Sequence, residues 1–181
     1  MIARPKISRN ERKTTEIGAF EVGNFAPFSC PGGTGLAVDA LRPALAAATA
    51  VVGGDISQAS LDLCAARGYT ATRRMDLEDP LPLEGSIFDA VVCVGVLSYV
   101  RDFRRLFAEW CRITSPGGVV VFTHRAHLWR GDDASREAAR ELEAAGTWTL
   151  TFASEPRPYM PNNPDPEERA KTIVCARFIV A

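Results

Sequence analysis

The sequence lacks the residue spacings that mark several classes of protein. Its 181 residues include two histidines, and its five cysteines contain no C-x-x-C pair. Metal sites and redox motifs depend on such spacings. Scattered, reduced cysteines behave as small buried hydrophobic residues and are typical of an intracellular compartment. We therefore predict no metal site and a cytoplasmic protein.

The sequence also has almost no excess of charge of either sign and no long apolar segment. The formal net charge is -1 at pH 7, which gives no general attraction to nucleic acid or to an anionic membrane. The longest apolar run, residues 90–100, is shorter than the roughly 20 residues that span a bilayer. The G-x-S-x-G and G-x-x-x-x-G-K-[ST] motifs are absent. These absences favour a small-molecule partner and leave the oligomeric state open.

The most informative segment that is present is VVGGDIS, residues 51–57. It has the composition of a buried strand that ends on Asp55, followed directly by the start of a helix. Ligands bind at this edge of open α/β sheets, where an acidic residue typically holds the hydroxyls of a ribose. A helix cap is the alternative role for Asp55, but Ser57 is itself a good N-cap. The pattern therefore predicts a ribose-binding carboxylate.

A glycine-rich segment, PGGTG (residues 31–35), precedes Asp55 by about twenty residues and is followed by a helical run. This is the spacing of a nucleotide-binding βαβ unit. A strand should come before it, yet residues 24–30 contain Pro27 and few β-branched residues. Val38 stands where dinucleotide-binding enzymes have a third small residue, which disfavours a nicotinamide cofactor. The segment thus predicts a cofactor turn behind an eroded first strand.

Further motifs follow in a set order along the chain. They are Asp76 after a predicted third strand, Phe88-Asp89 at the start of a fourth, and Pro116-Gly117-Gly118 before a fifth. With Gly33-Thr34-Gly35 and residues 54–57, this order resembles that of class I S-adenosylmethionine-dependent methyltransferases of type 11. The tail, residues 146–163, is similar to that of the methyltransferase-like protein of the Williams–Beuren syndrome region. The resemblance covers about residues 30–181.

The resemblance implies a Rossmann-like α/β fold: a doubly wound, mostly parallel sheet in three αβα layers. Strands 147–153 and 172–180 would form a C-terminal antiparallel hairpin, joined by a proline-rich loop. Helices are predicted at 57–67, 102–114 and 133–145 from their capping residues and apolar spacing. The hydrophobic content of 46% suits one domain, residues 30–181, behind an N-terminal arm of residues 1–29.

The function implied is methyl transfer from S-adenosylmethionine, with that compound as the cofactor. Asp55 would bind the ribose, Asp76 and the Leu77 N–H the adenine, and the end of the fourth strand the methionine part. The predicted cofactor-binding residues are Gly33, Thr34, Gly35, Asp55, Ile56, Asp76, Leu77, Cys93 and Val94.

The acceptor side is predicted at Tyr99, His124 and Tyr159. His124 is expected to follow the fifth strand at the ligand edge, where a residue that titrates near neutral pH suits a general base. An ordinary surface histidine and packed tyrosines remain alternatives. No catalytic residue is predicted, because a sulfonium methyl group is already activated. The alternative function is a non-catalytic or scaffold protein that keeps the fold but has lost productive cofactor binding.

Overall fold

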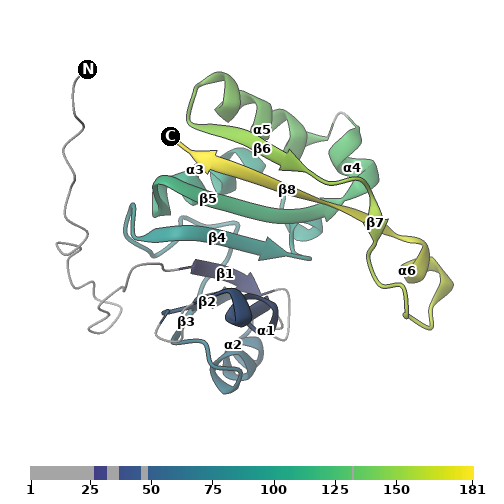
Figure 1. The fold of residues 1–181 in the computed structure, drawn as a ribbon, viewed down its shortest axis with the longest axis horizontal. Coiled ribbons are helices and arrows are strands. Elements are labelled where there is room, and N and C mark those ends of the chain that lie inside the picture. Colours follow the sequence, from purple (N-terminus) through teal and green to yellow (C-terminus); the bar gives the residue numbers. More distant parts are fainter. Residues whose placement is uncertain (1–26, 32–36, 46–48, 132) are drawn as a thin grey trace.

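The computed structural model describes residues 27–31, 37–45, 49–131 and 133–181. An eight-stranded sheet crosses the molecule in the order β3-β2-β1-β4-β5-β8-β6, with β7 paired to β8 (Figure 1). Strands β1 to β5 are parallel, whereas β8 runs antiparallel to both β5 and β6. Helices flank the sheet. The predicted doubly wound fold with a C-terminal antiparallel hairpin is confirmed.

The element bounds are as follows. The strands are β1 (Pro27–Pro31), β2 (Val52–Asp55), β3 (Ala71–Arg74), β4 (Phe88–Val94), β5 (Thr114–Arg125), β6 (Trp148–Ala153), β7 (Arg157–Pro158) and β8 (Thr172–Val180). The helices are α1 (Ala37–Leu41), α2 (Gln58–Ala66), α3 (Phe103–Ile113), α4 (Ala126–Arg130), α5 (Ala134–Ala144) and α6 (Pro166–Ala170), with 3₁₀ turns η2 (Arg42–Ala44) and η3 (Leu97–Tyr99).

The first strand forms in the middle of the sheet, although its sequence predicts an eroded strand. It pairs in parallel with β2 on one side and with β4 on the other. Its two prolines, Pro27 and Pro31, are its first and last residues. A proline removes a donor from the ladder, and this loss is tolerated best at a strand end. Because β1 begins at Pro27, a domain boundary between residues 29 and 30 would divide this strand.

The main helices begin and end where their capping residues predict. Ser57 accepts a hydrogen bond from the Ser60 N–H at the start of α2, and Asp102 accepts one from the Arg105 N–H at the start of α3. Gly68, just beyond α2, has φ = 85°, a left-handed value that glycine adopts without a Cβ penalty. Local sequence therefore sets these boundaries.

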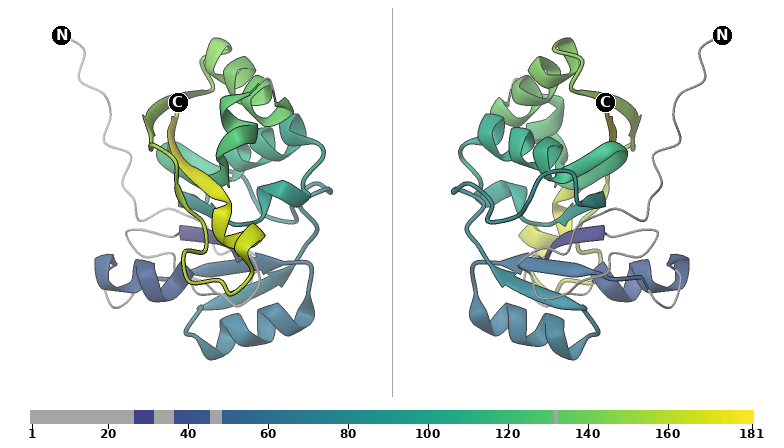
Figure 2. Two further views of the ribbon diagram at one scale, coloured as in Figure 1. Left: turned by 90° about the vertical axis from the view of Figure 1, so that its right-hand side faces the viewer. Right: turned by 90° about the vertical axis from the view of Figure 1, so that its left-hand side faces the viewer.

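Two apolar cores of unequal size lie on opposite faces of the sheet. The larger contains the buried face of α3, together with Phe122, Trp148 and Phe178. The smaller comprises Val38, Val51, Cys64 and Tyr69, with Leu45 packed against it. Figure 2 shows α3, α4 and α5 gathered on one side of the strands, away from α1 and α2. The sheet thus separates a thickly packed layer from a thin one.

The C-terminal hairpin carries a long excursion between β6 and β8. Within it, β7 pairs with β8, and the Tyr159 N–H donates a hydrogen bond to the Lys171 carbonyl over 2.9 Å. Asp165 caps the short helix α6. These contacts fix the proline-rich segment against the sheet end. No helix in the described part of the chain is long and apolar enough to cross a membrane.

Candidate functional site

A cleft of about 710 Å³ opens where the parallel strands β2, β3 and β4 end. This edge is where ligands bind in doubly wound sheets, and the volume lies within the range of small-molecule sites. Its walls come from segments that are far apart in the sequence. The lining residues are Gly54, Asp55, Ile56, Ser60, Met75, Asp76, Leu77, Glu78, Gly95, Val96, Tyr99, Val100, Arg101 and Tyr159.

Asp55 ends β2 at this cleft, where it contacts the start of α2 and also lines the cleft wall. Its Oδ1 accepts a hydrogen bond from the Ser57 N–H over 2.8 Å, which supports the start of α2. Its Oδ2 has no hydrogen-bond partner within the described part of the chain. The next residue, Ile56, is 57% exposed at the same wall. One carboxylate oxygen is therefore available to a ligand beside an exposed apolar side chain.

Asp76 and Leu77 lie in a tight turn after β3. The Glu78 N–H donates to Asp76 Oδ1 over 2.9 Å, and the Asp79 N–H donates to the Asp76 carbonyl over 3.2 Å. The N–H groups of Asp76 and Leu77 have no partner among the described residues. The turn therefore offers the cleft a carboxylate acceptor and a backbone donor on adjacent residues.

The chain after β4 lines the cleft with the two residues that follow the predicted pair. Cys93 is fully buried in the larger core, and Val94 is exposed at the strand end outside the cleft lining. Gly95 and Val96 line the cleft instead. Gly95 has φ = 76°, and its N–H donates to Thr123 Oγ1 over 3.0 Å. The glycine conformation turns the chain across the end of the sheet, and this turn exposes these residues to the cleft.

Two tyrosines form the remaining wall. Tyr99, at the end of η3, is 82% exposed, and Tyr159 reaches the cleft from the proline-rich segment. The guanidinium carbon of Arg125 lies 4.8 Å from the centre of the Tyr159 ring. A Cβ added at Gly95 would lie 3.2 Å from the Tyr159 hydroxyl. The structure thus brings Tyr159 and Tyr99 into the same cleft as Asp55, and Arg125 stacks on the Tyr159 ring.

His124 does not lie at the cleft, contrary to the prediction from its sequence position. It is within β5, paired with Val174 of β8, and its ring is 2% exposed against Phe103. Its Nε2 is 3.7 Å from Asp133 Oδ1. Burial lowers the pKa of His124, and the nearby Asp133 carboxylate opposes this shift. Side chains alternate along a strand, and His124 faces the thick layer.

The predicted glycine turn, Gly33, Thr34 and Gly35, lies outside the described residues. Eight cleft residues were not among the predicted site residues: Gly54, Ser60, Met75, Glu78, Gly95, Val96, Val100 and Arg101. The signal that could have found Gly95 and Val96 is their position immediately after a buried strand, the same signal that found Asp55. Among the described residues, no group of three histidine, cysteine or acidic side chains could hold a metal ion.

A family model described as "Methyltransferase domain" matches residues 29–122, which is more than half of the chain. The chain belongs to this methyltransferase family. The matched residues include the three strands, β2, β3 and β4, whose ends form the cleft. No curated protein matches this methyltransferase, and the resemblance of its tail to the Williams–Beuren protein stays a prediction.

Solved structures share the fold of this methyltransferase. An S-adenosylmethionine-dependent methyltransferase from Mesorhizobium loti has a TM-score of 0.66 at 19% identity, covering 88% of this chain and 92% of its own. One from Methanosarcina mazei has a TM-score of 0.64 at 13% identity, covering 86% and 92%. A geranyl diphosphate methyltransferase in complex with S-adenosylmethionine has a TM-score of 0.62 at 16% identity, covering 87% and 78%. At these identities the likeness establishes the fold.

Proposed function

We propose that this methyltransferase binds S-adenosylmethionine in the cleft and transfers its methyl group to a small-molecule acceptor that enters beside Tyr99 and Tyr159. The observation that carries the proposal is the meeting of Asp55 and Asp76 at neighbouring strand ends in one cleft of about 710 Å³. Carboxylates at this edge of a doubly wound sheet suit the hydroxyl and amino groups of a nucleoside.

The groups that line the cleft fit such a donor. Asp55 Oδ2 can accept from a ribose hydroxyl, Asp76 can accept from the amino group of adenine, and the Leu77 N–H can donate to a ring nitrogen. Ile56 offers an apolar surface to the face of the base. The end of β4, at Gly95 and Val96, would border the methionine part, one or two residues beyond Cys93 and Val94.

Bound S-adenosylmethionine supplies a methyl group that its sulfonium already makes electrophilic. The chain therefore has to bind the donor, orient the acceptor in line with it and exclude water. Favourable orientation of two reactants lowers a barrier by as much as about 7–11 kcal/mol. Tyr99 and Tyr159 would serve this purpose as walls of the acceptor side. His124 takes no part, because its ring is buried away from the cleft.

A small-molecule acceptor is supported by charge and by the nature of the acceptor wall. The formal net charge of -1 gives no general attraction to nucleic acid. Arg125 stacks on the ring of Tyr159, and this contact restrains an aromatic side chain that lines the cleft.

Calorimetric titration with S-adenosylmethionine tests the donor assignment. We expect saturable binding at one site per chain. Transfer of a labelled methyl group to pooled small molecules, to total RNA and to total protein then tests the acceptor class, and we expect label in the small-molecule pool. Absence of donor binding would favour the scaffold alternative, and label confined to RNA or protein would refute the small-molecule assignment.

A further inference from the structure

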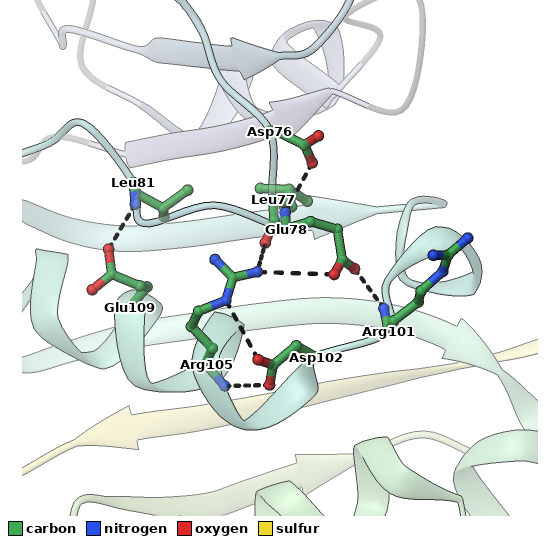
Figure 3. A network of polar contacts seen from close by, with 8 residues as sticks. All are labelled: Asp76, Leu77, Glu78, Leu81, Arg101, Asp102, Arg105 and Glu109. Atoms are coloured by element: carbon green, nitrogen blue, oxygen red, sulfur yellow. Dashed lines mark hydrogen bonds and ion pairs between the residues drawn. The ribbon is translucent and has the colours of Figure 1, made fainter.

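Two arginines of α3 hold the loop that connects β3 to β4, and they hold it at different distances from the cleft. Arg105 Nη2 donates to the Leu77 carbonyl over 3.1 Å, at the cleft end of the loop. Two helical turns later, Arg112 donates to the carbonyls of Leu81 and Leu83 over 3.0 and 2.8 Å. The Leu81 N–H donates to Glu109 over 2.8 Å. Figure 3 shows Arg105 between Leu77 and the start of α3.

Among its polar neighbours, the Arg105 side chain lies closest to the Leu77 carbonyl, at 3.1 Å. Its Nε lies 3.5 Å from Asp102 Oδ2, and its Nη2 lies 3.9 Å from Glu78 Oε2, which is beyond hydrogen-bond distance. Its Nη1 is buried with no partner among the described residues. A buried donor without a partner costs stability. The hydrogen bond that this guanidinium does make holds the peptide that joins Leu77 to Glu78.

Both peptides that flank Leu77 are held, and the one that carries its N–H is held by the Asp79 N–H at the Asp76 carbonyl. The Leu77 carbonyl belongs to Arg105, and the following N–H, that of Glu78, belongs to the Asp76 side chain. The Glu78 carboxylate in turn accepts from the Arg101 N–H at the start of α3. The N–H of Leu77 itself has no partner within the described part of the chain. The network thus fixes a turn whose Asp76 and Leu77 N–H groups are unused among the described residues.

We propose that Arg105 is a positioning residue that sets the Leu77 N–H for recognition of the purine edge of the methyl donor. The proposal rests on the proposed function, because it requires the nucleoside to lie against Asp76 and Leu77. A hydrogen-bonding group has to be held within about 0.5 Å to discriminate between ligands. Arg105 supplies this restraint from outside the cleft: it holds the peptide that follows Leu77, while the Asp79 N–H holds the Asp76 carbonyl of the peptide that carries the Leu77 N–H.

The test compares two ligands, S-adenosyl-L-homocysteine and S-inosyl-L-homocysteine, by calorimetry. The second replaces the purine amino group with a carbonyl and places a proton on the adjacent ring nitrogen, so the hydrogen-bonding edge is inverted. We expect the parent to prefer the adenosyl compound by about tenfold or more. Arg105→Gln should reduce this preference at least about threefold, because the turn that presents the Leu77 N–H loses its contact with α3 and is held less rigidly.

Arg112→Gln is the matched control. It removes an arginine that also holds loop carbonyls from α3, but at Leu81 and Leu83, away from the cleft. Its melting temperature should fall while the ligand preference stays that of the parent. If Arg105→Gln does not fold, Arg105→Lys is measured in its place, because lysine keeps the charge without the planar fork of donors.

The outcomes are distinct. A parent that binds neither ligand refutes the proposed function. A parent that binds both ligands equally refutes recognition of the purine edge by Leu77, while donor binding stands. An arginine-105 variant that keeps the parent's preference refutes the positioning role, and so does an equal loss of preference in Arg112→Gln.

Discussion

Asp55 allows cofactor binding and helix capping to be separated, because its two carboxylate oxygens have different neighbours. Oδ1 caps the start of α2 through the Ser57 N–H, and Oδ2 is available at the cleft. Asp55→Asn keeps an oxygen that can serve as the cap but removes the negative charge. We expect the free energy of unfolding to change little, since asparagine caps a helix about as well as aspartate. Cofactor affinity should fall.

The size of the loss follows from the type of hydrogen bond. A hydrogen bond to a charged group contributes about 1.5–3 kcal/mol, so losing the charge-assisted bonds to a ribose should weaken binding about 10- to 150-fold. Ser57→Ala is the control, because it removes the other cap acceptor of α2 and leaves the carboxylate in place. It should lower the free energy of unfolding by about 1 kcal/mol with little change in affinity.

Calorimetry with S-adenosyl-L-homocysteine and urea denaturation of the three proteins would measure both effects. Parental affinity in Asp55→Asn would refute the ribose assignment. A loss of affinity in Ser57→Ala equal to that in Asp55→Asn would show that the start of α2, rather than the carboxylate, governs binding.

Three further predictions concern packing, pH and the acceptor wall. In Gly54→Ala, the added Cβ would lie 2.7 Å from both Met75 Sδ and Phe28 Cζ, so overpacking should lower the free energy of unfolding by about 1–3 kcal/mol in urea denaturation. Burial lowers the pKa of His124 below the 6.5 of an unfolded chain, so the free energy of unfolding should decrease as the pH falls below 6.5. In His124→Gln, the free energy of unfolding should decrease less between pH 7.5 and 5.5. Tyr159→Ala should reduce methyl transfer while the calorimetric donor affinity stays near that of the parent; an equal loss of both would contradict its assignment to the acceptor side.

The parts of the fold that depend on local signals could be predicted from the sequence. Ser57 and Gly68 delimit α2, and the apolar spacing of Phe103 to Ile113 defines α3. Asp55 and Asp76 were found at the cleft because each follows a strand, and parallel strands end at one edge. The family motifs supplied the strand order, which no local signal contains.

The features that the sequence did not predict depend on which strands pair and on which face of the sheet a side chain occupies. A strand with prolines at both ends is tolerated in the centre of this sheet because β2 and β4 pair with the residues between them. His124 follows three consecutive valines and Phe122, a run without alternation, so the sequence does not reveal which face it occupies. The short strand β7 forms within a proline-rich segment because β8 provides a pairing partner. Helix α6 follows in the same segment, where Asp165 caps it.

The unequal size of the two cores implies that α2 and α3 differ in the free-energy cost of local unfolding. The α2 layer is held to the sheet by a small cluster, whereas α3 is packed among many buried aromatic rings. Regions with fewer buried contacts undergo local unfolding at a lower free-energy cost, so amide hydrogens of α2 should exchange with solvent sooner than those of α3. A ligand that joins Asp55, on the thin side, to Asp76 and Gly95 would slow exchange in α2 most. Cofactor binding in this protein would then also order the α2 layer.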